Sequence, residues 1–262
     1  PIYIDERGGC GAMSATSVAA FLRRDLLLLR RNTASLISMF VVPPLFLLCL
    51  YAVFGYSAGQ SGFGYLRFVL GGCLFQAAMF TAAASAMAVG QDVESGLVDR
   101  VRVLPGATGG YVAGRLATDV LRMSASIAAL LIVAWACGLD MALGDVAWTV
   151  LWSLLAAAVL SLVTDGVILM VPAPVSTASS IQALEMLLLM FSTAFIPTTA
   201  VDGSLRDIVR HMPFSPVIEV IRAASPGAFP NHAGEEAALW LGVATVVGIV
   251  LFIRLFTSRS ES

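Results

Sequence analysis

The sequence predicts an all-α membrane protein that crosses the bilayer several times. Of its 262 residues, 58% are hydrophobic and 12% are charged, and the mean hydropathy is +0.89. Soluble domains carry roughly 25% charged residues, so this composition is typical of the membrane class. The apolar residues come in long runs, and the chain accommodates about six spans of roughly 20 residues each. We therefore predict a polytopic protein with six transmembrane helices.

The segment before the first span, 1–32, is predicted to be cytoplasmic and to end in an interfacial helix over 16–31. An apolar stripe at helical spacing supports this helix: Val18, Leu22, Leu26 and Leu29. Two arginine pairs recur seven residues apart and share a face: Arg23, Arg24, Arg30 and Arg31. Such a helix lies in the headgroup layer with its arginines reaching anionic lipid. The alternative is an N-terminal extension of the first span.

Six spans are predicted in order along the chain: 33–56, 65–90, 116–138, 146–171, 177–196 and 237–256. Pro43-Pro44 lies inside the first of them and predicts a kink, because proline breaks the helical hydrogen-bond ladder. Residues 197–234 are less hydrophobic and rich in proline, with apolar pieces too short to cross. We expect one or two re-entrant helices there. The transmembrane domain would then cover 33–256, with a cytoplasmic tail at 257–262.

The longest polar break in the first half of the chain is 91–115, between the second and third spans. Four apolar residues at helical spacing predict a short amphipathic helix: Val93, Leu97, Val101 and Leu104. Pro105-Gly106 and Gly109-Gly110 are expected to end it. A short helix of this kind, with one apolar face and a position at the membrane surface, is a plausible binding site for a soluble partner. The alternatives are a solvated connecting helix and a stripe covered by lipid.

The distribution of arginine predicts the orientation. With a cytoplasmic N-terminus, the inner side holds eleven arginines: Arg7, Arg23, Arg24, Arg30, Arg31, Arg100, Arg102, Arg115, Arg122, Arg254 and Arg259. The outer side holds four: Arg67, Arg206, Arg210 and Arg222. This asymmetry follows the positive-inside rule. Both termini and the 91–115 element are thus predicted inside, and 197–234 outside.

Composition also excludes several kinds of site. All fifteen basic residues are arginine, and a Walker A phosphate loop needs a lysine. The chain has two histidines, His211 and His232, and four cysteines without CxxC spacing. We therefore expect no ATP site, no metal site and no catalytic cofactor on this chain, and no nucleic-acid partner.

Two alternative functions attach to particular residues. Gly55 to Gly59 matches G-x-S-x-G and makes Ser57 a candidate nucleophile, although an elbow of this kind needs a strand before it.

Asp165 and Glu185 fall within the fourth and fifth spans, where a carboxylate is costly. They are candidates for a translocation path or for an ion-coupled secondary carrier. The alternative is a structural polar contact, with Thr164, Gln182 or a neighbouring subunit as partner. Asp119 with Arg122 and Glu219 with Arg222 are spaced as local ion pairs.

Two stretches, 93–122 and 195–223, resemble the permease subunit of type-2 ABC exporters, close to the daunorubicin-resistance branch. The first matches the family at Glu94, Gly96, Leu97, Leu104, Pro105, Gly114 and Arg115. The second matches at Pro197, Leu205, Pro216, Ile221 and Arg222. It departs at Ser215, where many members have Asn, and lacks the usual Pro-x-Trp. The resemblance covers nearly the whole chain, with the motifs in order relative to six spans.

The resemblance implies a plasma-membrane exporter without ATP chemistry of its own. It implies two separate ATPase subunits that carry ATP and Mg²⁺, and a second permease, either identical or related. The cargo would be a hydrophobic or amphipathic molecule, either a drug such as an anthracycline or a lipid. The 91–104 element would be the coupling helix that docks into the ATPase. Its candidate contact residues are Val93, Glu94, Leu97, Arg100, Val101 and Leu104.

Overall fold

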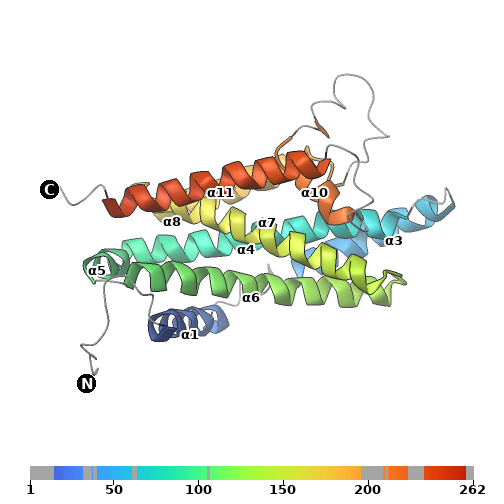
Figure 1. Cartoon of the computed structure of the whole chain (residues 1–262). Coiled ribbons are helices and arrows are strands. Elements are labelled where there is room, and N and C mark those ends of the chain that lie inside the picture. The colour runs from blue at the N-terminus through green and yellow to red at the C-terminus, as the bar shows by residue number, and fades with distance from the viewer. Residues whose placement is uncertain are drawn as a thin grey trace.

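The protein is a bundle of long α-helices (Figure 1). The computed structural model describes residues 15–31, 37, 40–60, 64–104, 107–195, 209–210, 212–223 and 233–257, and no strand occurs among them. The helices are α1 (Ala15–Arg31), α3 (Val42–Gln60), α4 (Tyr65–Glu94), α5 (Leu97–Val103), α6 (Ala107–Ala136), α7 (Leu143–Ile168), α8 (Pro174–Met190), α10 (Ser215–Arg222) and α11 (Ala233–Thr257). The all-α prediction is confirmed for these residues.

Four helices are long and apolar enough to cross a membrane: α4, α7, Gly109–Ala136 of α6 and Ala233–Phe252 of α11. A 30-residue helix such as α4 is about 45 Å long, more than the roughly 30 Å of a hydrocarbon core. The apolar part of α3, Val42–Gly55, is shorter, and α8 has 17 residues. A multi-pass membrane protein is therefore confirmed, whereas the count of six spans stays a prediction.

The centre of the bundle is α4. Its most apolar 18-residue window is 83% buried, against 17% for the corresponding window of α11, so α4 is enclosed and α11 is peripheral. Small residues allow this enclosure. A Cβ on Gly72 would lie 3.1 Å from the Phe195 ring, and a Cβ on Gly90 would lie 3.1 Å from the backbone nitrogen of Val175. The helices α3, α6, α7, α8 and α10 all pack against α4.

The two ends of the bundle differ in which elements they hold. The end that carries α5, here called the α5 end, also holds the C-terminal part of α11 and lies beside α1 (Figure 1). The opposite end, here called the α10 end, holds α10 and the start of α4. This arrangement places α1, α5 and the close of α11 together, as the arginine distribution predicts.

Two predicted boundaries need correction, and the predicted re-entrant region is described only in part. The third helix begins at Ala107, so Gly109 and Gly110 lie inside α6 and do not end the preceding helix. Pro43 and Pro44 lie in the first turn of α3, directly after a turn at Val41. Proline is tolerated there because a first-turn N–H has no partner within the helix. The predicted re-entrant region is described only at 209–210, 212–223 and from Ala233, where it contains the short helix α10.

Candidate coupling surface and the ion network behind it

The polar element between the second and third long helices is broken in two. The helix α4 runs to Glu94, and the Ser95 N–H bonds to the Gln91 carbonyl in its last turn. Gly96 then adopts φ 70°, a left-handed conformation that favours glycine, and α5 begins at Leu97. The prediction of one helix through 93–104 is therefore wrong, because the glycine ends α4 and changes the direction of the chain.

The break changes which side of α5 is buried. Val98 and Val101 are 4% and 3% exposed and pack against Ala86, Val89 and Tyr111. Of the predicted apolar stripe, Val101 is buried, Val93 and Leu97 are half-buried, and Leu104 is 56% exposed. The predicted stripe assumes one continuous helix. The turn at Ser95 and Gly96 separates α4 from α5, so the residues on either side of it do not share one face.

The outward side of α5 combines exposed apolar and charged residues. Val103 is 79% exposed and stands next to Leu104, while Glu94 and Arg100 are also exposed. Asp99 accepts a hydrogen bond from Arg102 at 3.0 Å on this side. We call Glu94, Asp99, Arg100, Val103 and Leu104 the α5 surface. The sequence analysis did not single out Val103. Successive helical residues point about 100° apart, so Val103 and Leu104 could not both face the interior of the bundle.

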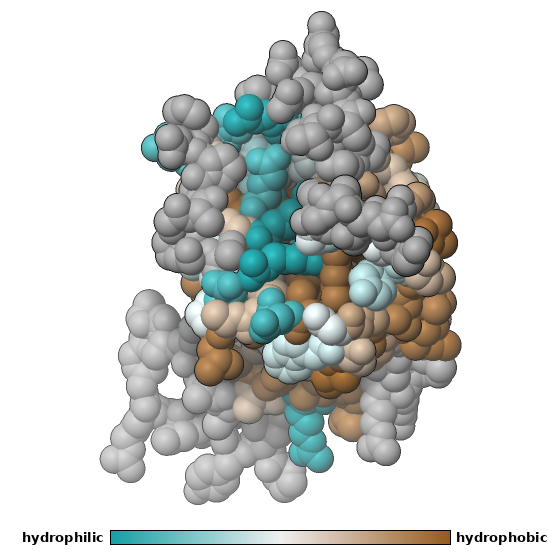
Figure 2. Space-filling view, turned by 90° about the vertical axis from the view of Figure 1, so that its right-hand side faces the viewer, coloured by the Kyte–Doolittle hydropathy of each residue, from teal (hydrophilic) through white to brown (hydrophobic). Residues whose placement is uncertain are grey.

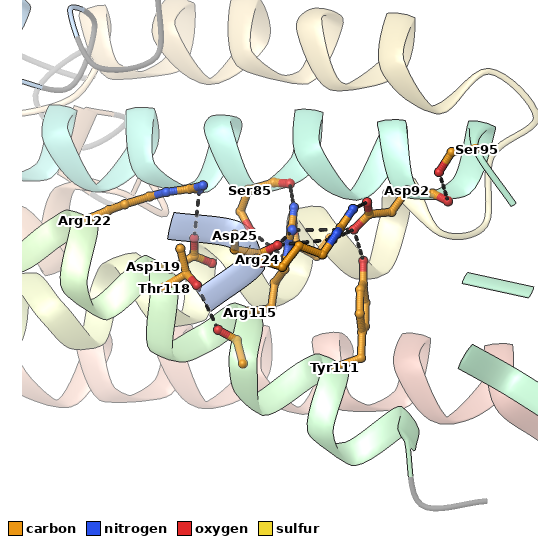
Figure 3. Close-up of polar contacts among 12 residues, drawn as sticks. Arg24, Asp25, Ser85, Asp92, Ser95, Tyr111, Arg115, Thr118, Asp119 and Arg122 are labelled. Carbon is orange, nitrogen blue, oxygen red and sulfur yellow. Dashed lines mark hydrogen bonds and ion pairs between the residues drawn. The ribbon is translucent and has the colours of Figure 1, made fainter. Parts of the chain in front are cut away.

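Behind the α5 surface, α1 is joined to α4 by ion pairs (Figure 3). Both guanidinium nitrogens of Arg24 donate to the Asp92 carboxylate, one of them at 3.1 Å, and Arg24 also contacts Asp25 at 3.2 Å. The hydrogen bond to Asp92 raises the pKa of Arg24 above its usual value. The prediction that Arg24 reaches toward lipid is thus wrong, because its guanidinium group pairs with Asp92 of α4. Arg23 is exposed, and its contact with lipid stays a prediction; the side chains of Arg30 and Arg31 lie outside the described residues.

Arg115 joins three helices at the centre of this network (Figure 3). It is 4% exposed, and its two terminal nitrogens donate to Asp25 of α1 and to the Ser85 carbonyl of α4, each at 2.9 Å. The Tyr111 hydroxyl donates to Asp92 at 3.1 Å and completes the network. Sequence reasoning did not find this constellation. The sequence did offer one signal: Asp25 follows Phe21 by four residues, so the two share a face of the helix. In the structure that face packs against α6.

Two more buried carboxylates lie beside this network. Asp119 accepts a hydrogen bond from Arg122 at 3.3 Å, which confirms the predicted local ion pair. Asp165 of α7 accepts a hydrogen bond from the Ser85 hydroxyl at 2.8 Å. The partner proposed from sequence, Thr164, instead donates to backbone carbonyls of its own helix.

Glu185 lies apart from Asp165. It is 8% exposed in α8, and its Oε2 has no hydrogen-bond partner among the described residues. No ion pair or hydrogen bond within the described part of the chain joins Glu185 to Asp165. The structure therefore does not assemble these two predicted residues into one site.

Polar residues at the α10 end are held differently. Figure 2 views this end and shows a hydrophilic band beside hydrophobic flanks. Arg222 donates to the backbone carbonyls of Phe68, at 2.9 Å, and of Ala194, and its guanidinium lies 3.8 Å from the Phe68 ring centroid. The predicted local ion pair of Arg222 with Glu219 does not form a salt bridge within the described residues, although the two opposite charges attract each other. Arg67 pairs with Asp145 at 2.6 Å nearby.

The other sequence candidates receive little support from the geometry. The helix α3 continues through Ser57 to Gln60, so Ser57 does not follow a strand as a nucleophile elbow requires. Its side chain lies outside the described residues. No group of three metal-binding side chains occurs in the described part of the chain.

The sequence of this helical chain is similar to those of known proteins. The family model described as "ABC-2 type transporter" matches residues 16–225, which cover α1 through α10. Over 117 residues, the chain is 32% identical to the daunorubicin resistance ABC transporter permease protein DrrB1 of Streptomyces coeruleorubidus. That alignment covers 44% of this chain and 41% of the relative, so it spans less than half of either protein. The family match covers most of the chain, and the protein belongs to the ABC-2 type transporter family.

Proposed function

We propose that this chain is the membrane permease subunit of an ATP-driven exporter at the plasma membrane. Family membership supports the transporter class, and the similarity to a drug-resistance permease supports export. The cargo would be a hydrophobic or amphipathic molecule, a drug or a lipid. Six membrane crossings, with α3 and α8 as the shorter two, would place both termini and the α5 surface in the cytoplasm.

The observation that carries this proposal is the exposed apolar pair on the α5 surface. Val103 and Leu104 are exposed at one end of the bundle, next to charged residues, while Val98 and Val101 hold α5 to the bundle. An apolar pair with a charged rim has the composition of a protein docking site. We assign it to a separate ATPase subunit, two of which would serve a pair of permeases and would bind ATP and Mg²⁺.

The mechanism we propose is a shift between two conformations. ATP binding would bring the ATPase subunits together, and each would move the α5 surface of its permease. The ion pairs from α1 to α4 and α6 would transmit that motion to the long helices. Glu185, buried with an unpartnered oxygen, is our candidate for the translocation path.

Changing Val103 and Leu104 tests the docking assignment. The double variant Val103→Asp/Leu104→Asp should bind the ATPase subunit at least ~10-fold more weakly, because burying one such side chain contributes about 1.5–3 kcal/mol. Binding would be measured by titrating the purified ATPase subunit onto the permease in nanodiscs. Leu143→Asp is the matched control, because Leu143 is 85% exposed at the other end of the bundle.

Equal binding by the double variant and the Leu143→Asp control would refute the docking assignment. A Leu97→Asp variant would discriminate less well, because the Leu97 side chain is half-buried against the bundle and its loss would also disturb α5.

A further inference from the structure

The buried ion network carries one more carboxylate than guanidinium group. Among the described residues, its carboxylates are Asp25, Asp92, Asp119 and Asp165, and its guanidinium groups are those of Arg24, Arg115 and Arg122. An excess charge at this depth is costly unless it is neutralised. The network therefore requires one more positive charge than these side chains supply.

The unmatched carboxylate is Asp165. Arg24 and Arg115 form ion pairs with Asp25 and Asp92, and Arg122 pairs with Asp119. Asp165 is 3% exposed and receives only the neutral hydroxyl of Ser85 at Oδ2, while its Oδ1 has no partner in the described structure. A single neutral hydrogen bond does not offset the burial of a charge.

Asp165 lines a small cavity. Tyr111, Arg115, Asp165 and Phe252 are among its lining residues, and the volume open to the centre of a water molecule is about 10 Å³. One water needs roughly that volume and two to four polar partners. Arg115 and Asp165 both line the cavity, and Arg115 Nε and Asp165 Oδ1 are buried polar atoms that lack a partner among the described residues.

We propose that Asp165 is a proton-binding site, with one water molecule in the adjoining cavity as its exchange partner. The proton resides on Oδ1, because Oδ2 already accepts the hydrogen bond from Ser85. The Oδ1–H group donates to the water, which also accepts from Arg115 Nε–H and donates to the Tyr111 hydroxyl oxygen. The proton neutralises the excess charge without a metal ion.

The surroundings of Asp165 determine when the proton is held. From α6 it faces Arg115, Arg122 and Asp119, the last close enough for the two negative charges to repel each other. Tyr111 of α6 is also near, and α4 contributes Ser85. From α11, Phe252 closes the cavity. The two terminal nitrogens of Arg115 donate to Asp25 of α1 and to the Ser85 carbonyl, and neither forms a hydrogen bond with Asp165 in the described structure.

A consequence follows if the proposed function is correct. Displacement of α1 by the ATPase would release Arg115 from Asp25. The freed guanidinium would then pair with Asp165, and the proton would leave through the water. Transport would in this way be linked to release of a proton.

Infrared spectroscopy of the purified permease in lipid tests the site without any partner subunit. We expect a protonated-carboxyl C=O stretch at neutral pH that is lost in Asp165→Asn. The experiment is made in a Glu185→Gln background, because Glu185 is a further buried carboxylate with an unpartnered oxygen. Asp119 Oδ2 also lacks a partner among the described residues, but Oδ1 of that carboxylate is paired with Arg122. An unchanged carboxyl band in Asp165→Asn would overturn the proposal.

A second variant keeps the test decisive if Asp165→Asn does not fold. Ser85→Ala removes the hydrogen bond that Asp165 receives within the described structure and should shift the frequency of the band without abolishing it. Exchange into D₂O should shift the band further, because water reaches the proton. A band that responds to neither change belongs to another group, and Asp165 is then not the proton site.

Discussion

The α5 end and the α10 end of the bundle bury polar groups by different means. At the α5 end, side chains of α1, α4 and α6 neutralise one another through Arg24, Asp25, Asp92 and Arg115. At the α10 end, Arg222 is satisfied by backbone carbonyls and by the face of an aromatic ring. Side-chain pairs can exchange partners while the helices move, whereas carbonyls are fixed by the main chain.

Glycine contacts reinforce this difference. At the α10 end, α4 approaches its neighbours so closely that a Cβ on Gly71 would overlap the Arg222 side chain and a Cβ on Gly72 would lie 2.5 Å from the Ala194 carbonyl oxygen. At the α5 end, Asp25 and Asp92 reach their partners through long, flexible arginine side chains. We therefore expect the α5 end to be adjustable and the α10 end to be fixed.

The largest effect on stability is expected from Arg115→Met. The variant leaves Asp25 with one partner and removes the side-chain hydrogen bond to the Ser85 carbonyl, so we expect a loss of about 3–5 kcal/mol in the free energy of unfolding. Unfolding of the purified protein in detergent measures it. Arg100→Met is the control, because Arg100 is exposed. A loss below about 1 kcal/mol would mean that charge pairing does not hold the α5 end together.

A smaller loss is expected from Gly72→Ala at the other end. The new Cβ would meet the Ala194 carbonyl oxygen, a backbone atom that cannot rotate away, and overpacking typically costs about 1–3 kcal/mol. Gly64→Ala is the matched control, because no atom lies within 4 Å of its Cβ position. Equal unfolding temperatures for these two variants would show that the α10 end yields easily and would remove the contrast between the ends.

The smallest effect is expected from Arg67→Gln. Arg67 pairs with Asp145 at 2.6 Å, but the two side chains are 36% and 20% exposed. Solvent screening limits such pairs to about 0–1 kcal/mol. The same unfolding assay should place this variant near the wild type. A loss comparable with that of Arg115→Met would show that burial is not what separates the two pairs.

Local pattern alone determined much of this protein. Hydropathy located α4, α7 and α11 to within a few residues, and the spacing of Asp119 and Arg122 predicted their ion pair. The motif order around 93–122 indicated the family that the comparison then showed. These features depend on residues that lie three to about twenty positions apart in the chain, so they can be predicted from the sequence alone.

Tertiary structure decided what the buried charges do. Asp25 meets Arg115 across 90 positions of the chain, and Ser85 meets Asp165 across 80, so no local spacing could pair them. The turn at Gly96 likewise buried Val98, which lies outside the predicted stripe, beside Val101 and left Leu104 of the stripe exposed. Hydropathy identifies which segments leave water, but only packing selects the partner that makes a buried charge tolerable.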